Sequence, residues 1–157
     1  MLIYGRLEGA IYVSSFQDHP DIDEDLIVGN IVHELAHMLE DKYHYEIYGD
    51  DRIEKEYVGK KKRLIDLLRA NGISFQGMGN LFFSDDMVDE FDEFLFKQLG
   101  YDSLSSITPG LFLSPYSVTS LREYFANGFE EYINGDSNYL KEISPVLFNK
   151  LESFLDN

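Results

Sequence analysis

Apolar residues recur at helical spacing along most of the chain after residue 25. From Leu26 to Leu39 they fall on one side of a predicted helix, and Asp25 is placed to cap its N-terminus. A second helix is predicted over residues 52–70, because its apolar positions also share one side and an Asn-Gly pair follows it. These two segments predict helices in the first half of the chain.

The second half predicts three more helices separated by irregular segments. Their ranges are 84–99, which ends at a glycine, then 118–134, and a last helix that opens at the Ser-Pro pair 144–145. Residues 72–79 are rich in glycine and residues 102–116 carry two prolines, so both segments are predicted to be irregular.

A short β-rich stretch precedes the first helix. Residues 10–14 read Ala-Ile-Tyr-Val-Ser, and a turn cluster at 18–21 follows them, which favours a strand that leads into the helix. No internal repeat or linker is visible, and 157 residues suit one domain with its own core. The predicted fold class is therefore α+β: a single domain over 1–157 that is mostly helical, with a small N-terminal β element.

Two features of the composition limit the possible functions. No apolar run approaches the ~20 residues that span a bilayer, and the first residues lack the basic and long apolar regions of a signal peptide. We therefore expect a soluble protein without a membrane span. The chain has no cysteine, so a metal ion would have to be held by histidine, aspartate or glutamate.

The charge balance is strongly acidic. Against 29 Asp and Glu stand 13 Lys and Arg, which gives a net charge of −16. Such a chain repels nucleic acid and anionic membranes, and it favours a basic protein or peptide as partner. Seven of the 13 positive charges lie within residues 52–69, which predicts either a docking face or a solvated helix face.

The sequence His33-Glu34-Leu35-Ala36-His37 lies inside the first predicted helix. A helix advances 3.6 residues per turn, so the two histidines project from one face with the glutamate between them. This spacing is typical of zinc hydrolases, in which the glutamate acts on a water molecule at an open coordination position. We therefore predict a Zn²⁺ site at His33 and His37 with Glu34 as general base.

Zinc needs a third protein ligand, and several positions can be compared. A third histidine in the pattern His-Glu-x-x-His-x-x-Gly-x-x-His would fall at Tyr43, and the glycine position holds Glu40, so that class does not fit. Glu54 and Glu56 lie near the distance of a later glutamate ligand, but they lack the Asn-Glu-x-x-x-Asp surroundings of thermolysin-like enzymes. They remain second candidates.

Glu123 is the better candidate. It lies on the helix predicted over 118–134, near the border of apolar positions that would pack into the core. From residue 123 the sequence reads Glu-Tyr-Phe-Ala-Asn-Gly-Phe. Here the chain resembles the catalytic domain of anthrax lethal factor and the bacterial Pro-Pro endopeptidases, which pair His-Glu-x-x-His with a later Glu-(Tyr/Phe)-Phe-Ala-x-x-Phe helix. Those peptidases carry a tyrosine seven residues before that glutamate, and position 116 here is Tyr116.

This resemblance covers about residues 10–41 and 111–155. It implies a zincin-type metallopeptidase domain of the gluzincin class with three zinc ligands, namely His33, His37 and Glu123. It further implies a zinc-dependent endopeptidase in which Glu34 assists the attack of a zinc-bound water on the peptide bond. In such enzymes the residue that matches Tyr116 donates a hydrogen bond to the oxyanion.

The chain departs from that family in three respects, the first being that only 32 residues precede His33. Residues 42–110 form a predicted insertion, and Asn127 stands where the family has a glutamate that orients a zinc histidine. By resemblance the substrate is a peptide that lies extended along the strand at 10–14, and we expect it to be basic or to contain proline. The resemblance also implies a secreted, toxin-like enzyme, although this chain shows no export signal.

Two other functions remain open at this stage. The chain could be a non-catalytic interaction protein that keeps the zincin fold and binds a partner through residues 42–110. It could also be a hydrolase of another bond type, or a gluzincin whose third ligand is Glu54 or Glu56. The glutamate whose substitution causes loss of the metal is the third ligand, and this distinguishes Glu54 and Glu56 from Glu123.

Overall fold

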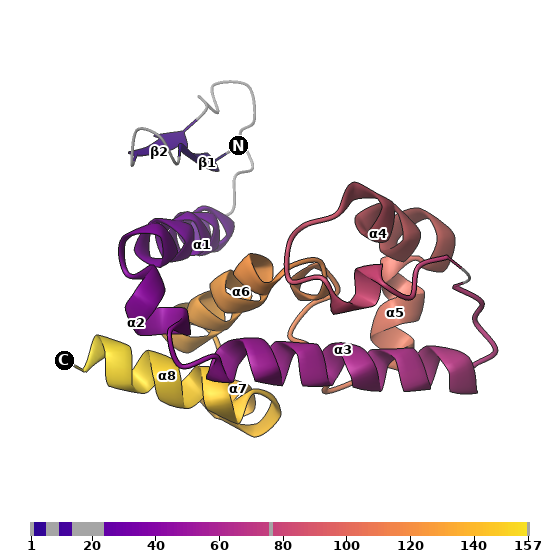
Figure 1. The fold of residues 1–157 in the computed structure, drawn as a ribbon. Helices are drawn as coiled ribbons and strands as arrows, with labels where there is room; N and C mark the ends of the chain where they lie inside the picture. The colour runs from indigo at the N-terminus through magenta and orange to yellow at the C-terminus, as the bar shows by residue number, and fades with distance from the viewer. Residues whose placement is uncertain (1, 6–9, 14–23, 76, 157) are drawn as a thin grey trace.

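Helices make up most of the protein, whose computed structural model describes residues 2–5, 10–13, 24–75 and 77–156 (Figure 1). The predicted helix-rich character is confirmed. The long helices are α1 (Glu24–Lys42), α3 (Arg52–Ala70), α6 (Leu121–Asn134) and α8 (Pro145–Leu155). The shorter ones are α2 (His44–Tyr48), η1 (Leu81–Phe83), α4 (Asp89–Glu93), η2 (Phe94–Leu99), α5 (Tyr101–Ile107), η3 (Tyr116–Val118) and α7 (Ser137–Ile143). Within the described ranges, no helix has the length and apolar character needed to cross a membrane.

Two short strands lie beside α1 (Figure 1). Strand β1 (Leu2–Gly5) pairs antiparallel with β2 (Ala10–Val13), with Leu2 opposite Val13. The strand predicted at 10–14 overlaps β2, whereas Ser14 and the turn cluster at 18–21 lie outside the described residues.

Helix α3 supplies much of the core and packs against α2, η1, α6 and α8. The side predicted to be apolar is fully buried, and its residues are Ile53, Tyr57, Leu64 and Leu68. The Tyr57 hydroxyl also donates a 2.7 Å hydrogen bond to the backbone carbonyl of Val118. Helix α3, which belongs to the predicted insertion 42–110, is therefore part of the core.

Two lysines of the basic stretch are buried, which neither sequence-based interpretation expected. Lys60 Nζ donates to the carbonyl of Leu111 and to Ser144 Oγ, both at 2.7 Å. Lys61 Nζ donates to the carbonyl of Ser84 at 2.6 Å. Burial lowers the pKa of each amine to about 8. These amines hydrogen-bond α3 to residues outside that helix, so they belong to neither a docking face nor a solvated face.

Several predicted boundaries are wrong. Helix α1 already includes Glu24, so Asp25 lies in its acidic first turn and is not the cap. The helix predicted from residue 84 begins only at 89. The segment 102–116, predicted as irregular, contains most of α5, because Gly100 adopts a φ of 83° that lets the chain turn and start a new helix. Helices α2 and α7 were not predicted.

Helices α6 and α8 approach each other at a glycine. A Cβ atom placed on Gly128 would collide with the side chain of Leu147. The glycine therefore allows the two helices to pack closely, and this contact fixes α6, which faces α1 on another side.

Candidate metal centre

Packing of α1 against α6 brings three predicted site residues together (Figure 1). Nε2 of His33 lies 3.0 Å from Glu123 Oε2, and Nε2 of His37 lies 3.3 Å from Glu123 Oε1. One potential ligand atom from each residue lies within 4.8 Å of the others. Each carboxylate oxygen thus faces one imidazole, although 86 residues separate His37 from Glu123 in the sequence.

The start of α6 explains how Glu123 reaches the histidines. Ser120 is the N-cap residue, and its hydroxyl oxygen accepts a 3.1 Å hydrogen bond from the backbone N–H of Glu123. In a full capping box the glutamate at this position would turn back to the cap residue. Here its carboxylate faces the two imidazoles instead, and the Ser-x-x-Glu pattern could have placed the helix start in the sequence.

The far side of each imidazole also faces a carboxylate. His37 Nδ1 lies 2.9 Å from Glu40 Oε2, and His33 Nδ1 lies 3.5 Å from Glu130 Oε2. Carboxylates in this position orient a metal-binding histidine and make its free nitrogen more basic. Sequence reasoning missed both residues, yet Glu40 follows His37 by three residues, a spacing that places them on one helix face.

The cluster holds protons tightly in the absence of metal. Burial lowers the pKa of His33 and of His37, but the surrounding carboxylates outweigh burial and raise both to about 9. Burial raises the pKa of Glu123, but hydrogen bonds from the two histidines outweigh it and lower that pKa to about 2. The pair of imidazoles is therefore cationic and the glutamate anionic at neutral pH.

An open cleft of about 280 Å³ borders the cluster. It provides space in front of Glu34, His37 and Glu123. The rest of its lining consists of Asp85, Asp86, Met87, Ser120 and Arg122. Glu34 therefore lines the same cleft as two of the predicted ligands, His37 and Glu123.

Tyr116 lies on η3, just before α6, and is 41% exposed. Burial raises the pKa of its hydroxyl, and the charges of Glu123, Asp92 and Glu34 raise it further. The hydroxyl therefore stays protonated at neutral pH and can donate a hydrogen bond. Tyr116 is not among the residues that line the cleft.

The role expected for Asn127 is not the one that the structure shows. Its side-chain oxygen accepts a 2.9 Å hydrogen bond from Ser114 Oγ, and its side-chain nitrogen donates a 2.9 Å bond to the backbone carbonyl of Glu123. Both polar atoms are therefore engaged away from the imidazoles. Glu130, one helical turn further along α6, lies beside His33 in its place.

The second candidates for the third ligand lie elsewhere. Both carboxylate oxygens of Glu56 accept hydrogen bonds at the start of α8, from the backbone N–H groups of Val146 and Leu147. The Tyr124 hydroxyl donates to Glu56 as well, at 2.8 Å. Glu54 lines a neighbouring cavity with Glu40 and Arg122. Among the described residues, the group of potential ligands that includes the two histidines is completed by Glu123.

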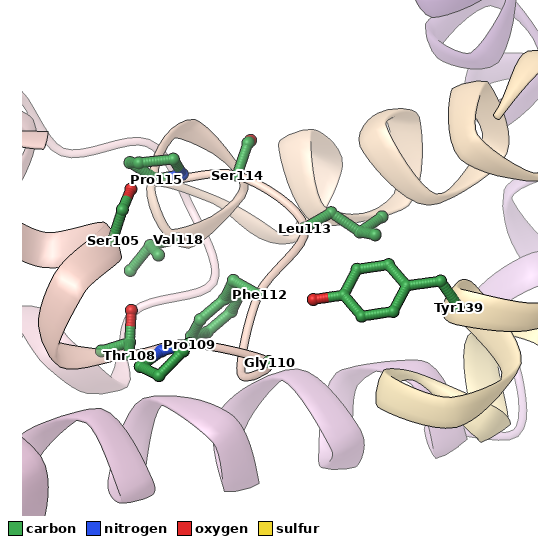
Figure 2. A pocket seen from close by; sticks show the side chains of 10 residues that line it. All are labelled: Ser105, Thr108, Pro109, Gly110, Phe112, Leu113, Ser114, Pro115, Val118 and Tyr139. Atoms are coloured by element: carbon green, nitrogen blue, oxygen red, sulfur yellow. The ribbon is translucent and has the colours of Figure 1, made fainter. Parts of the chain in front are cut away.

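A separate cavity of about 170 Å³ lies behind the segment that leads to Tyr116. Figure 2 shows the Tyr139 ring extending from α7 toward the loop that carries Phe112 and Leu113. The predicted site residues do not line this cavity; its walls are Ser105, Thr108, Pro109, Gly110, Phe112, Leu113, Ser114, Pro115, Val118 and Tyr139.

Comparisons with protein-family models, with curated proteins and with solved structures found no match. The lethal factor-like assignment therefore rests on the motif residues and their spacing, and it stays a prediction.

Proposed function

We propose that this protein is a zinc-dependent endopeptidase with a lethal factor-like site. The observation that carries the proposal is the convergence of His33, His37 and Glu123, two of which line a cleft together with Glu34. Two imidazoles and one carboxylate with an open fourth position is the ligand set of many catalytic zinc sites.

The donor set fits Zn²⁺ in three respects. The Nε2 atoms of both histidines point at the same carboxylate, and their Nδ1 atoms face Glu40 and Glu130. Nitrogen donors favour zinc over Mg²⁺ and Ca²⁺, which prefer oxygen. Finally, each protonated imidazole carries a proton on the Nε2 atom that faces Glu123, and a metal ion bound there would replace that proton.

Glu34 and Tyr116 would supply the remaining chemistry. When bound, zinc would act as a Lewis acid that polarises a carbonyl group and makes water more acidic. Glu34 would take a proton from water as it attacks the peptide carbon, and would pass that proton to the leaving amine. The protonated hydroxyl of Tyr116 would donate a hydrogen bond to the carbonyl oxygen as negative charge develops there.

The cleft favours a basic peptide as substrate. Asp85 and Asp86 line it together with two of the proposed ligands, His37 and Glu123. The net charge of −16 would also attract cationic peptides over a longer range. The resemblance alone suggests proline at the cleavage site, secretion and a toxin role.

Metal content tests the proposal. We would measure zinc by elemental analysis after dialysis in wild type and in Glu123→Gln, with Glu54→Gln and Glu56→Gln as matched controls. We expect one zinc per chain in wild type and in both controls, and loss of zinc in Glu123→Gln. A peptide-library screen would then compare wild type with Glu34→Gln, which should bind zinc but not cleave.

Two results would contradict the proposal. If zinc is retained in Glu123→Gln but lost in a control variant, the third ligand is Glu54 or Glu56 and not Glu123. Absence of zinc from every form, with a bound protein partner, would instead favour the interaction-protein function.

A further inference from the structure

Glu40 is a buried carboxylate with several partners. It is 2% exposed and lies on α1 one turn after His37. Its Oε2 atom lies 2.9 Å from His37 Nδ1, and its Oε1 atom accepts a hydrogen bond from the Tyr48 hydroxyl. The Nε atom of Arg122 lies 3.8 Å from Oε2. A carboxylate buried to this extent is costly unless such partners compensate it.

These partners come from three helices. His37 and Glu40 belong to α1, Tyr48 to α2 and Arg122 to α6. The Arg122 guanidinium is itself held by a 3.0 Å contact with Asp41. The position of Glu40 is therefore defined from several directions, which limits the rotation of the imidazole that it contacts.

The equivalent contact of His33 is weaker. Glu130 is 3.5 Å from His33 Nδ1, and its side chain is 40% exposed. An exposed carboxylate competes with water for its partner and keeps more rotamer freedom, so it orients a ring less firmly. The two imidazoles of the site are thus supported unequally.

We propose that Glu40, held by Tyr48, is the positioning residue of the metal site, fixing the His37 ring so that Nε2 faces the metal position. Glu130 contributes much less on the side of His33. This inference rests on the proposed function, because it assumes that a metal ion binds at His33, His37 and Glu123.

The two acceptor oxygens of Glu40 suggest a selective test. In Glu40→Gln one oxygen becomes an NH₂ group, which can donate to the Tyr48 hydroxyl oxygen while the amide oxygen accepts from His37. The His37 ring then keeps only an uncharged and weaker acceptor. In the double variant Glu40→Gln/Tyr48→Phe the buried NH₂ group loses its acceptor, so the amide is no longer held in place beside His37. A purely structural role would lower the stability of these variants without changing the metal affinity of the folded protein.

We would measure Zn²⁺ affinity by competition with a chelator, and record the absorption spectrum of the Co²⁺-loaded forms. Glu40→Gln should bind zinc ~10–100-fold more weakly, and the double variant should bind it no more tightly than Glu40→Gln. Glu130→Gln serves as the matched control and should change affinity less than Glu40→Gln. The Co²⁺ spectrum should shift in Glu40→Gln, because the ligand geometry changes.

The outcomes separate this inference from the proposed function. If wild type binds no metal, the proposed function fails. The positioning role is wrong if wild type binds zinc and Glu40→Gln has the same zinc affinity as wild type. It is also wrong if Glu130→Gln loses more zinc affinity than Glu40→Gln. Should Glu40→Gln not fold, Tyr48→Phe decides, since it removes one oxygen atom and leaves Glu40 in place. A shifted Co²⁺ spectrum in Tyr48→Phe supports the inference, and a spectrum that shifts only in Glu130→Gln overturns it.

Discussion

The side chain of Asn127 donates a 2.9 Å hydrogen bond to the backbone carbonyl of Glu123, one turn earlier on α6. Its other polar atom accepts from Ser114, which lies in the segment just before Tyr116. Asn127 therefore links the helix that carries a proposed ligand to the turn that carries a proposed oxyanion donor.

This link predicts a specific effect of Asn127→Leu. Loss of the two hydrogen bonds should loosen the Ser114–Ser117 turn while the histidines keep their carboxylate partners. We expect faster hydrogen exchange at the backbone amides of Ser117 and Val118, and a zinc affinity within a few-fold of wild type. Ser114→Ala should reproduce part of the exchange effect. A 10–100-fold loss of zinc affinity in Asn127→Leu would instead mean that Asn127 orients an imidazole.

The metal-free protein should lose stability at alkaline pH. His33 and His37 have a pKa of about 9 in the folded state against an ordinary value of 6.5. Their contribution to the free energy of unfolding is thus fully present below pH 6.5 and is lost as pH rises through about 9. Urea unfolding of the metal-free protein at about pH 6 and about pH 9.5 measures this difference. Glu123→Gln should flatten the dependence, whereas His44→Gln, at an exposed position, should leave it in place.

Zinc affinity should rise with pH over the same range. A bound cation replaces the proton on Nε2 of each imidazole, so each displaced proton adds up to about tenfold in affinity per pH unit below the pKa. Chelator competition at several pH values between 6.5 and 9 would show this slope. Calorimetry in buffers of different ionisation enthalpy counts the protons released. A flat profile would mean that the metal binds away from these histidines.

Gly29 should tolerate alanine at a small cost to the site. A Cβ atom there would lie 2.8 Å from Glu130 Oε1, so the exposed Glu130 side chain would have to move away. Alanine also improves a helix interior by about 1 kcal/mol relative to glycine. We expect Gly29→Ala to melt at an equal or higher temperature and to bind zinc somewhat more weakly. A large loss of affinity would show that Glu130 matters more than its exposure indicates.

Replacing the acidic residues of the cleft should change substrate preference selectively. Asp85→Asn and Asp86→Asn should each reduce kcat/KM on lysine- or arginine-containing peptides by roughly 3–10-fold, and change neutral peptides little. Asp89→Asn provides a control with the same charge change at an exposed position that does not line the cleft. Equal effects of all three variants on all peptides would argue against a specific role for the cleft.

The sequence predicted the parts of this structure that depend on local periodicity. The apolar side of α3 and the one-turn spacing of His33 and His37 follow directly from 3.6 residues per turn. Glu123 required a resemblance, because no local rule connects residues so distant along the chain. Its position beside the histidines results from the packing of α1 on α6.

Other features depended on tertiary contacts that a single sequence does not display. Lys60 and Lys61 belong to a charged run, and their burial is possible only because acceptors from residues 84, 111 and 144 meet them. Helix α5 was hidden by the polar and serine-rich sequence around its one buried residue, Leu104. The role of Glu40 had a local signal, its spacing from His37, but its burial depends on contacts from α2 and α6.

The segment 84–87, which forms part of the cleft wall, is held by hydrogen bonds to its main-chain carbonyl oxygens. Lys61 binds the carbonyl oxygen of Ser84, and the backbone N–H of Leu121 binds that of Asp85 at 2.8 Å. Every amino acid has a carbonyl oxygen, so these attachments survive mutation of the side chains at 85–87. Substitutions at these positions could therefore change the charge and shape of the cleft wall without moving His33, His37 or Glu123.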